Sequence, residues 1–247
     1  MVVPRPAARR PCYQTSRGGV DTTVRRLTVV LLVPGLLALG ACAGQTTIID
    51  WVDFVQWNGI TYLHVPPGAT DPVLGPQVAA TKRKLADNET NPSHKLQEGD
   101  AAFLSAGTPI YSFRDYRAAF RIGVKTANGI AIYEADTNPK ARTGTDLVDL
   151  EGKVDYISIT DSSERDLATF HDPAAVAHLV GLILQAPVDQ SVQTPPGGPQ
   201  YFLAIHLHDG TKTVRAFWPS TGELQRGIMA GPEFARAIVA ALPSPAA

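Results

Sequence analysis

The stretch AAFRIGVKTANGIAIYEA (residues 118–135) carries the alternation that decides the fold class of this chain. Apolar side chains at Phe120, Ile122 and Val124 are separated by polar or small ones, which is the pattern of a strand with one buried face. The Asn-Gly pair at 128–129 supplies the two residues that a type I′ turn prefers. The stretch therefore predicts two antiparallel strands of a half-buried sheet.

Two further hairpins are expected from the same signal. Asn58-Gly59 is flanked by aromatic and β-branched residues, and Asp209-Gly210 lies inside YFLAIHLHDGTKTVRAFW (residues 201–218). A two-residue turn at Asp209-Gly210 would pair Ala204 with Arg215. Between the first two hairpins, residues 82–100 are polar and without a period, which predicts a long surface loop.

Two helices are expected in the second part of the chain. HDPAAVAHLVGLILQAP (residues 171–187) has Asp172 as a cap, Pro173 in the first turn and apolar residues at helical spacing, and GPEFARAIVAAL (residues 231–242) is similar. The predicted fold class is α+β: a β-rich N-terminal part with antiparallel hairpins (48–140), then a small antiparallel sheet with helices packed on one face (146–245).

The first 42 residues have the order of an export signal. Arg25 and Arg26 precede an apolar run of about 13 residues, too short to cross a bilayer as a helix, and small residues lead into Cys42. Leu39–Cys42 is similar to a bacterial lipobox, which implies that residues 1–41 are a signal peptide, that Cys42 receives a diacylglycerol and that 42–47 form a lipidated tether. Two alternatives stay open: an ordinary signal peptide with an incidental cysteine, and a translation start downstream of Met1.

Composition limits the partners. Without the first 41 residues, which hold six Lys or Arg and one Asp or Glu, the chain keeps 16 basic and 22 acidic side chains, a net charge of about −6. Such a charge predicts no general attraction to nucleic acid, so membrane contact is expected through the lipid, whose two acyl chains suffice for stable anchoring. Cys12 lies in the leader, so with Cys42 acylated no thiol is left for a disulfide.

A basic cluster in the middle of the chain is a candidate binding patch. Arg114, Arg117, Arg121 and Lys125 lie close together in sequence with Tyr111, Phe113 and Tyr116 among them. Such a patch suits an anionic wall polymer or a lipid headgroup. The alternative is an outward sheet face whose charge is balanced by Asp115.

The strongest metal-ligand pattern is weak. His206 and His208 are two apart on an expected strand and would point to one face, as paired ligands do, but no third ligand has a fixed spacing to them. A solvated hairpin face is the favoured explanation of the two histidines. No motif of a known hydrolase, zinc protease or nucleotide-binding loop is present, so no catalytic residue and no cofactor are predicted.

One stretch resembles known sequences. Gly99–Phe103, Gly107–Pro109, Tyr111 and the pair Phe120-Arg121 follow a GDAAF, GTP, Tyr, Phe-Arg pattern. Together with the lipobox, this resembles uncharacterised exported lipoproteins and cell-envelope proteins of Gram-positive, actinobacterial-type bacteria. The resemblance covers about 30 residues of the body, implies export and brings no activity.

The sequence thus favours a non-catalytic protein that a lipid anchors to the outer face of the cell membrane, where it binds a wall polymer or another envelope protein. The alternative is a divergent extracytoplasmic hydrolase or metal-binding protein whose functional residues are scattered in sequence and meet only in the fold.

Overall fold

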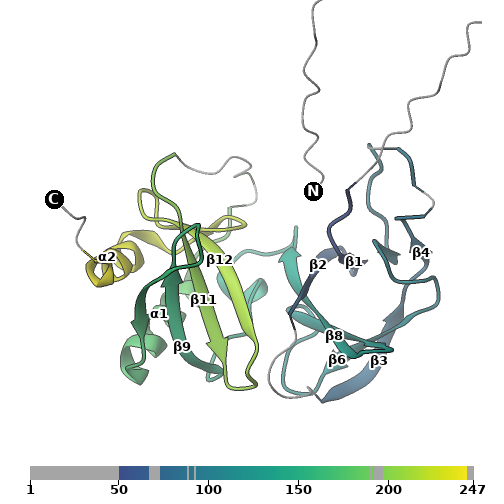
Figure 1. Ribbon diagram of the computed structural model, residues 1–247, viewed down its shortest axis with the longest axis horizontal. Coiled ribbons are helices and arrows are strands. Elements are labelled where there is room, and N and C mark those ends of the chain that lie inside the picture. Colours follow the sequence, from purple (N-terminus) through teal and green to yellow (C-terminus); the bar gives the residue numbers. More distant parts are fainter. Residues whose placement is uncertain are drawn as a thin grey trace, which may run out of the picture.

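The computed structural model describes residues 50–66, 73–87, 89–91, 93–189, 191 and 197–243. The predicted leader, Cys42 and the tether at 42–47 lie outside these residues. The described chain forms two sheets, one from residues 54–137 and one from residues 154–229, which lie side by side (Figure 1). We call the corresponding parts of the chain the N-terminal half and the C-terminal half.

The N-terminal half is a curled sheet with strand order β3-β6-β7-β8-β2-β1-β5-β4. All neighbours are antiparallel except β4 and β5. The edge strands β3 and β4 are consecutive in the chain and are separated by two residues, so the sheet curls round on itself. Its strands are β1 Phe54–Trp57, β2 Ile60–Val65, β3 Leu74–Ala80, β4 Arg83–Lys84, β5 Asp100–Ala101, β6 Pro109–Phe113, β7 Arg121–Thr126 and β8 Gly129–Thr137.

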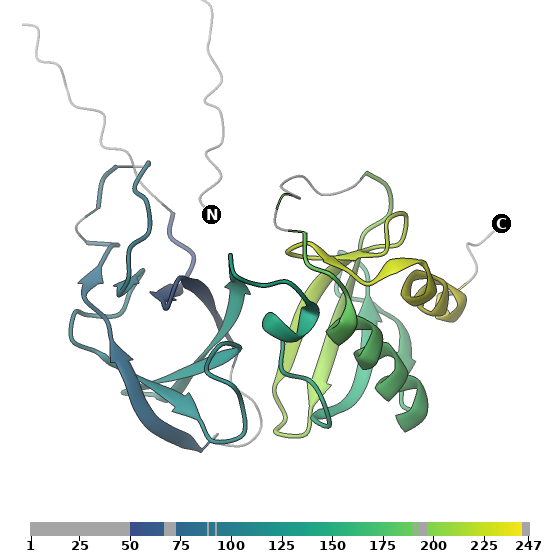
Figure 2. The ribbon, with the colours of Figure 1, turned by 180° about the vertical axis from the view of Figure 1, so that it is seen from behind.

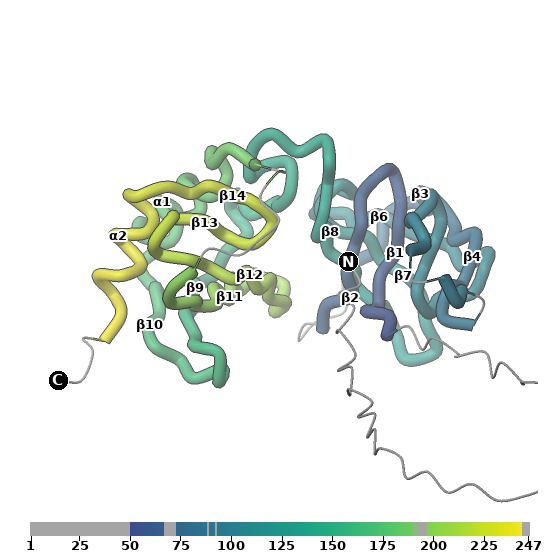
Figure 3. Tube along the Cα trace, turned by 90° about the horizontal axis from the view of Figure 1, so that it is seen from above, coloured from purple at the N-terminus to yellow at the C-terminus, as the bar shows by residue number. Residues whose placement is uncertain are grey.

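The C-terminal half is an antiparallel sheet with strand order β10-β9-β11-β12-β13-β14 and two helices. The chain reaches it from β8 through a connection that contains the short 3-10 helix η1 (Gly144–Asp146), and this connection bridges the two halves when they are seen from above (Figure 3). Its elements are β9 Val154–Thr160, β10 Asp166–Phe170, α1 Pro173–Gln185, β11 Tyr201–Leu207, β12 Lys212–Trp218, β13 Glu223–Leu224, β14 Ile228–Met229 and α2 Gly231–Ala241. The broad prediction of an α+β, strand-rich chain is confirmed.

Both predicted helices form where the sequence places them. The Asp172 carboxylate accepts a hydrogen bond from the backbone N–H of Ala175 at 2.8 Å, so it caps α1 as expected. The helix lies along one face of the strands (Figure 2), and its buried residues share a hydrophobic cluster with Ile157, Leu203 and Ile205. In the same cluster, the ring of Phe234 on α2 packs edge to face on Phe217 of β12.

The three hairpins differ in how well their turns were predicted. Asn58 and Gly59 both have positive φ, 53° and 74°, so this predicted turn is confirmed. In residues 118–135, Thr126 pairs with Gly129, so the turn consists of residues 127 and 128, and the prediction of Asn128-Gly129 is wrong by one position. Gly129, with φ 115°, follows the turn instead of forming its second half.

The third predicted turn is also wrong, with larger consequences. The backbone N–H of Leu207 donates to the carbonyl oxygen of Thr211 across the turn, so residues 208–210 form a three-residue loop with Gly210 at φ 78°. Arg215 consequently pairs with Leu203, not with Ala204. This shift by one residue turns Arg215 toward the core face of the sheet.

The stretch 82–100 is not the plain surface loop that was predicted. It contains β4, and Leu85 is fully buried against Phe54 and Ala102. His94 bridges two carboxylates, with its ring nitrogens 2.9 Å from both Glu89 and Asp100. These contacts order a polar segment that has no period of its own.

Candidate functional site at the junction of the two halves

Arg121 is the largest fully buried side chain in the described part of the protein. It begins β7, and its guanidinium forms an ion pair with Glu134 on the neighbouring strand β8. Its second terminal nitrogen donates a hydrogen bond to Asp209 of the C-terminal half at 3.0 Å. The rings of Tyr116 and Phe120 lie 4.3 and 5.2 Å from the guanidinium carbon, close enough for cation–π contact.

Asp209 is held from both halves. One carboxylate oxygen accepts from the hydroxyl and the backbone N–H of Thr211, at 2.6 and 2.9 Å, and the other accepts from the Tyr116 hydroxyl at 2.8 Å and from Arg121. Burial raises the pKa of Asp209, but these hydrogen bonds and the charge of Arg121 outweigh it and hold the pKa below its ordinary value of 3.8. The three-residue turn is what brings this carboxylate to the N-terminal half.

Two more arginines cross between the halves. Arg226 donates to Asp136 at 2.9 Å from Nε and lies 2.5 Å from its other oxygen through Nη2. Arg215 donates to the carbonyl oxygen of Ala135 at 2.9 Å. We call this set of contacts the junction; it comprises Tyr116, Arg121, Glu134, Ala135, Asp136, Asp209, Arg215 and Arg226.

The charged pairs of the junction should make the free energy of unfolding depend on pH. Because the pKa of Asp209 is lowered in the folded state, its stabilising effect is complete above the unfolded value and is lost as the pH falls through the folded value. We expect Asp209→Asn to be less stable than the wild type at neutral pH, and the difference to shrink below about pH 4 as Asp209 becomes protonated in the wild type. Urea denaturation of both proteins between pH 7 and pH 2.5 measures this. A difference that stays constant or widens below pH 4 would contradict it.

The four basic residues predicted as one binding patch do not lie on one surface. Arg121 is buried at the junction, so its inclusion in a patch was wrong: both halves cover it and two carboxylates pair with it. Arg117 donates to the carbonyl oxygens of Thr145 and Val148 in the connection between the halves. Arg114, Arg117 and Lys125 are exposed.

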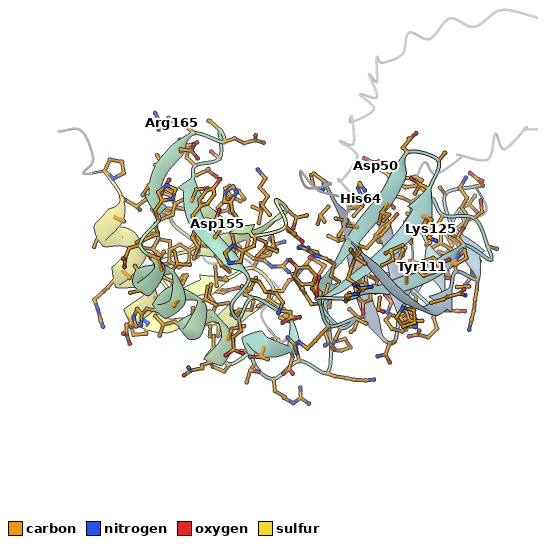
Figure 4. All side chains as sticks on the ribbon, turned by 90° about the horizontal axis from the view of Figure 1, so that it is seen from below. Asp50, His64, Tyr111, Lys125, Asp155 and Arg165 are labelled. Carbon is orange, nitrogen blue, oxygen red and sulfur yellow. The ribbon has the colours of Figure 1, made fainter. Side chains whose placement is uncertain are left out.

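Lys125 is placed away from the junction. Its ammonium lies 5.0 Å from the centre of the Tyr111 ring, and the two residues are neighbours on the N-terminal half (Figure 4). What remains of the predicted patch is therefore three exposed cations, of which Arg117 is bonded to the connection and Lys125 makes a local cation–π contact.

The two predicted metal candidates are also separated. His206 lies on β11, where its Nε2 is 3.1 Å from the hydroxyl of Ser158 and its ring stacks on Tyr156 at 3.9 Å. His208 is exposed in the turn, so the two rings do not share a strand face as expected. Among the residues that the structure describes, no group of three or more His, Cys, Asp or Glu side chains is arranged to hold a metal ion.

His206 belongs to a row of rings that the sequence did not reveal. The Tyr156 ring lies between those of His206 and His171, with the His171 centroid 5.1 Å away. Burial and the charge of Lys212 lower the pKa of His206, although Asp166 and Asp155 act in the opposite direction. Cross-strand pairing of Tyr156 with His206 is the signal that could have found this row, but it requires the strand register.

A second polar cluster lies at one end of the curled sheet. The Tyr133 hydroxyl contacts both oxygens of Asp53, at 3.2 and 3.3 Å, and the His64 ring packs against the Tyr133 ring at 5.4 Å. Burial raises the pKa of Asp53, and the Tyr133 hydrogen bond and His64 offset this only in part. His64 is exposed, near Asp50 (Figure 4), so the cluster opens to solvent.

The chain is thus an α+β protein of two sheets joined by partly buried ion pairs. Comparison with models of known protein families, with curated proteins and with solved structures finds no match to it. None of the helices in the described ranges is long and apolar enough to cross a membrane.

Proposed function

We propose that this protein is exported, anchored by a lipid on Cys42 to the outer face of the cell membrane, and acts there as a binding or structural protein rather than an enzyme. The observation that carries the proposal is the order of the leader: a pair of arginines, an apolar run, small residues and then cysteine. A similar order, with cysteine at this position, occurs in the exported lipoproteins that the chain resembles.

The arrangement of the body is compatible with a short tether. The described chain starts at Asp50, eight residues after Cys42, and eight extended residues span at most about 29 Å. The anchor would therefore hold the N-terminal half close to the bilayer. The wall polymer or envelope protein expected as a partner would then be bound near the outer surface of the membrane.

A binding role is supported by the contacts that the charged residues of the junction make. In the junction, Arg121 and Arg226 pair with carboxylates, which serves to fix the two halves. We further propose that both helices pack on the same face of the C-terminal sheet, as the sequence predicts. This would leave the opposite face, with Tyr156 and His206, for contact with a partner.

The lipid anchor is tested by replacing Cys42 with serine. The thioether to the diacylglycerol requires the cysteine sulfur, so Cys42→Ser should abolish acylation and signal cleavage at this position completely. Metabolic labelling with a fatty acid, followed by mass spectrometry of the amino terminus, measures both. Folding of the body should be unchanged by the substitution.

The second cysteine provides a matched control. Cys12→Ser removes the other thiol of the chain but leaves the lipobox intact, so labelling and cleavage should match the wild type. Labelling that persists in Cys42→Ser, or a mature protein that begins at another residue, would refute the proposed anchoring and localisation.

The alternative, an extracytoplasmic hydrolase, is favoured by one observation, the contact of Ser158 with His206. A serine nucleophile needs a base that is oriented by a third group. In the described ranges no carboxylate is hydrogen-bonded to the other ring nitrogen of His206, and Ser158 is only 7% exposed. Covalent labelling of Ser158 by a fluorophosphonate probe would favour this alternative, whereas no labelling would favour the binding role.

A further inference from the structure

Three buried polar atoms have no hydrogen-bond partner within the described residues: Nε of Arg121, Oγ1 of Thr213 and Nε of Arg215. The three residues are 0%, 1% and 8% exposed. Buried polar groups are nearly always hydrogen-bonded, because each one left without a partner is costly. Two of the three, on Thr213 and Arg215, belong to one strand, and together they point to a bound species.

The strand register places Thr213 and Arg215 along one line. Thr213 and Arg215 are two apart on β12, so they face the same side of the sheet as their partners Ile205 and Leu203. At one end of this line Asp209 contacts Arg121, and at the other Arg215 contacts the carbonyl oxygen of Ala135. Thr213 thus lies between two points at which the halves touch.

The charges of the junction are unevenly matched. Arg121 has two carboxylates in contact and Arg226 has one. For Arg215 no carboxylate oxygen lies within 4 Å in the part of the chain that the structure describes, although it is more than nine-tenths buried. A buried guanidinium is stabilised when an anion takes its remaining N–H groups.

We infer that the junction contains a binding site for a small inorganic anion, held by Arg215 and Thr213. The atoms without partners on these two residues are an N–H group, which can only donate, and a hydroxyl, which can donate. An anion accepts from both, whereas a water molecule also needs acceptors for its own hydrogens. Arg215 also donates to Ala135 of the N-terminal half, so an anion bound to Arg215 would help to hold the two halves together, independently of any lipid anchor.

Thr213→Val tests the site because valine has nearly the shape of threonine but no hydroxyl. The experiment follows thermal unfolding of the full-length wild type and variant while phosphate or chloride is raised at constant ionic strength, with the salt of a bulky organic anion as the replacement. We expect a saturable rise in the Tm of the wild type with one of the small anions. The rise should be lost in Thr213→Val.

Arg215→Lys is the second variant, since it keeps the positive charge but removes the guanidinium N–H groups, and it should also lose the rise. Thr169→Val is the control: Thr169 lies exposed on β10, so its substitution should leave the rise unchanged. A bromide-soaked crystal should show an anomalous peak within hydrogen-bond distance of Oγ1 of Thr213.

The opposite result has a distinct signature. If the hydroxyl of Thr213 contacts nothing or only water, small anions give the wild type no specific rise in Tm, and Thr213→Val keeps the same salt response as the wild type. That result, or an anion effect that survives in both Thr213→Val and Arg215→Lys, would overturn the inference.

Discussion

Replacing Arg121 by alanine should lower the free energy of unfolding by about 3–5 kcal/mol, because it leaves the buried Glu134 and the junction carboxylate Asp209 without their cation. The cost comes mainly from the desolvated carboxylates that lose their partner, and in addition the rings of Tyr116 and Phe120 lose the group packed on them. Urea denaturation followed by circular dichroism measures the change.

Arg114→Ala is the matched control for this prediction. Arg114 precedes Arg121 by seven residues but is exposed, so its removal should change stability by less than about 0.5 kcal/mol. If both substitutions lower the free energy of unfolding equally, burial at the junction is not the reason for the effect of Arg121→Ala. A double variant, Arg121→Met with Glu134→Leu, should recover part of the loss, because it removes a buried charge together with its partner.

Gly144→Ala should be the second strongly destabilising substitution, by about 3 kcal/mol. A Cβ at this position would lie 1.9 Å from the carbonyl oxygen of Ile183 in α1, and backbone atoms cannot rotate away as a side chain can. The close approach is fixed by a hydrogen bond from the N–H of Gly144 to the carbonyl oxygen of Ala186 at 2.8 Å. Thermal or urea unfolding of the variant measures the loss.

Gly181→Ala provides the opposite case in the same region. Gly181 lies inside α1, where an added Cβ meets no atom within 4 Å, so alanine should raise stability by about 0.5–1 kcal/mol through its higher helix propensity. If both glycine substitutions destabilise to the same degree, contact between the connection and α1 is not the reason for the effect at Gly144.

These substitutions bear on function through the geometry of the two halves. The junction joins residues that are 88 and 90 positions apart in the chain. A binding surface that spans both halves would depend on it, whereas the Tyr156 and His206 row lies within the C-terminal sheet alone. Partner binding by folded Arg121→Ala therefore distinguishes the two kinds of surface. Binding should be lost for a surface that spans both halves and kept for one on the C-terminal sheet alone.

The sequence by itself determined the elements whose signals are local. The turn at Asn58-Gly59 requires positive φ at two neighbouring positions, and α1 begins at Asp172-Pro173 and presents an apolar stripe, so a short window contains all the information needed. The α+β class followed from these elements. The lipid anchor on Cys42 is also read from local order and stays a prediction.

The tertiary structure alone decided what the charged residues do. Arg121 reads as an exposed residue of a basic cluster, and nothing near it in sequence shows that Asp209 will pair with it. The pairing depends on a turn of three residues rather than two, which shifts the register of β12 and turns Arg215 inward. Burial of a charge is stable only when distant partners meet it, so it is a property of the packed chain and leaves no local pattern in the sequence.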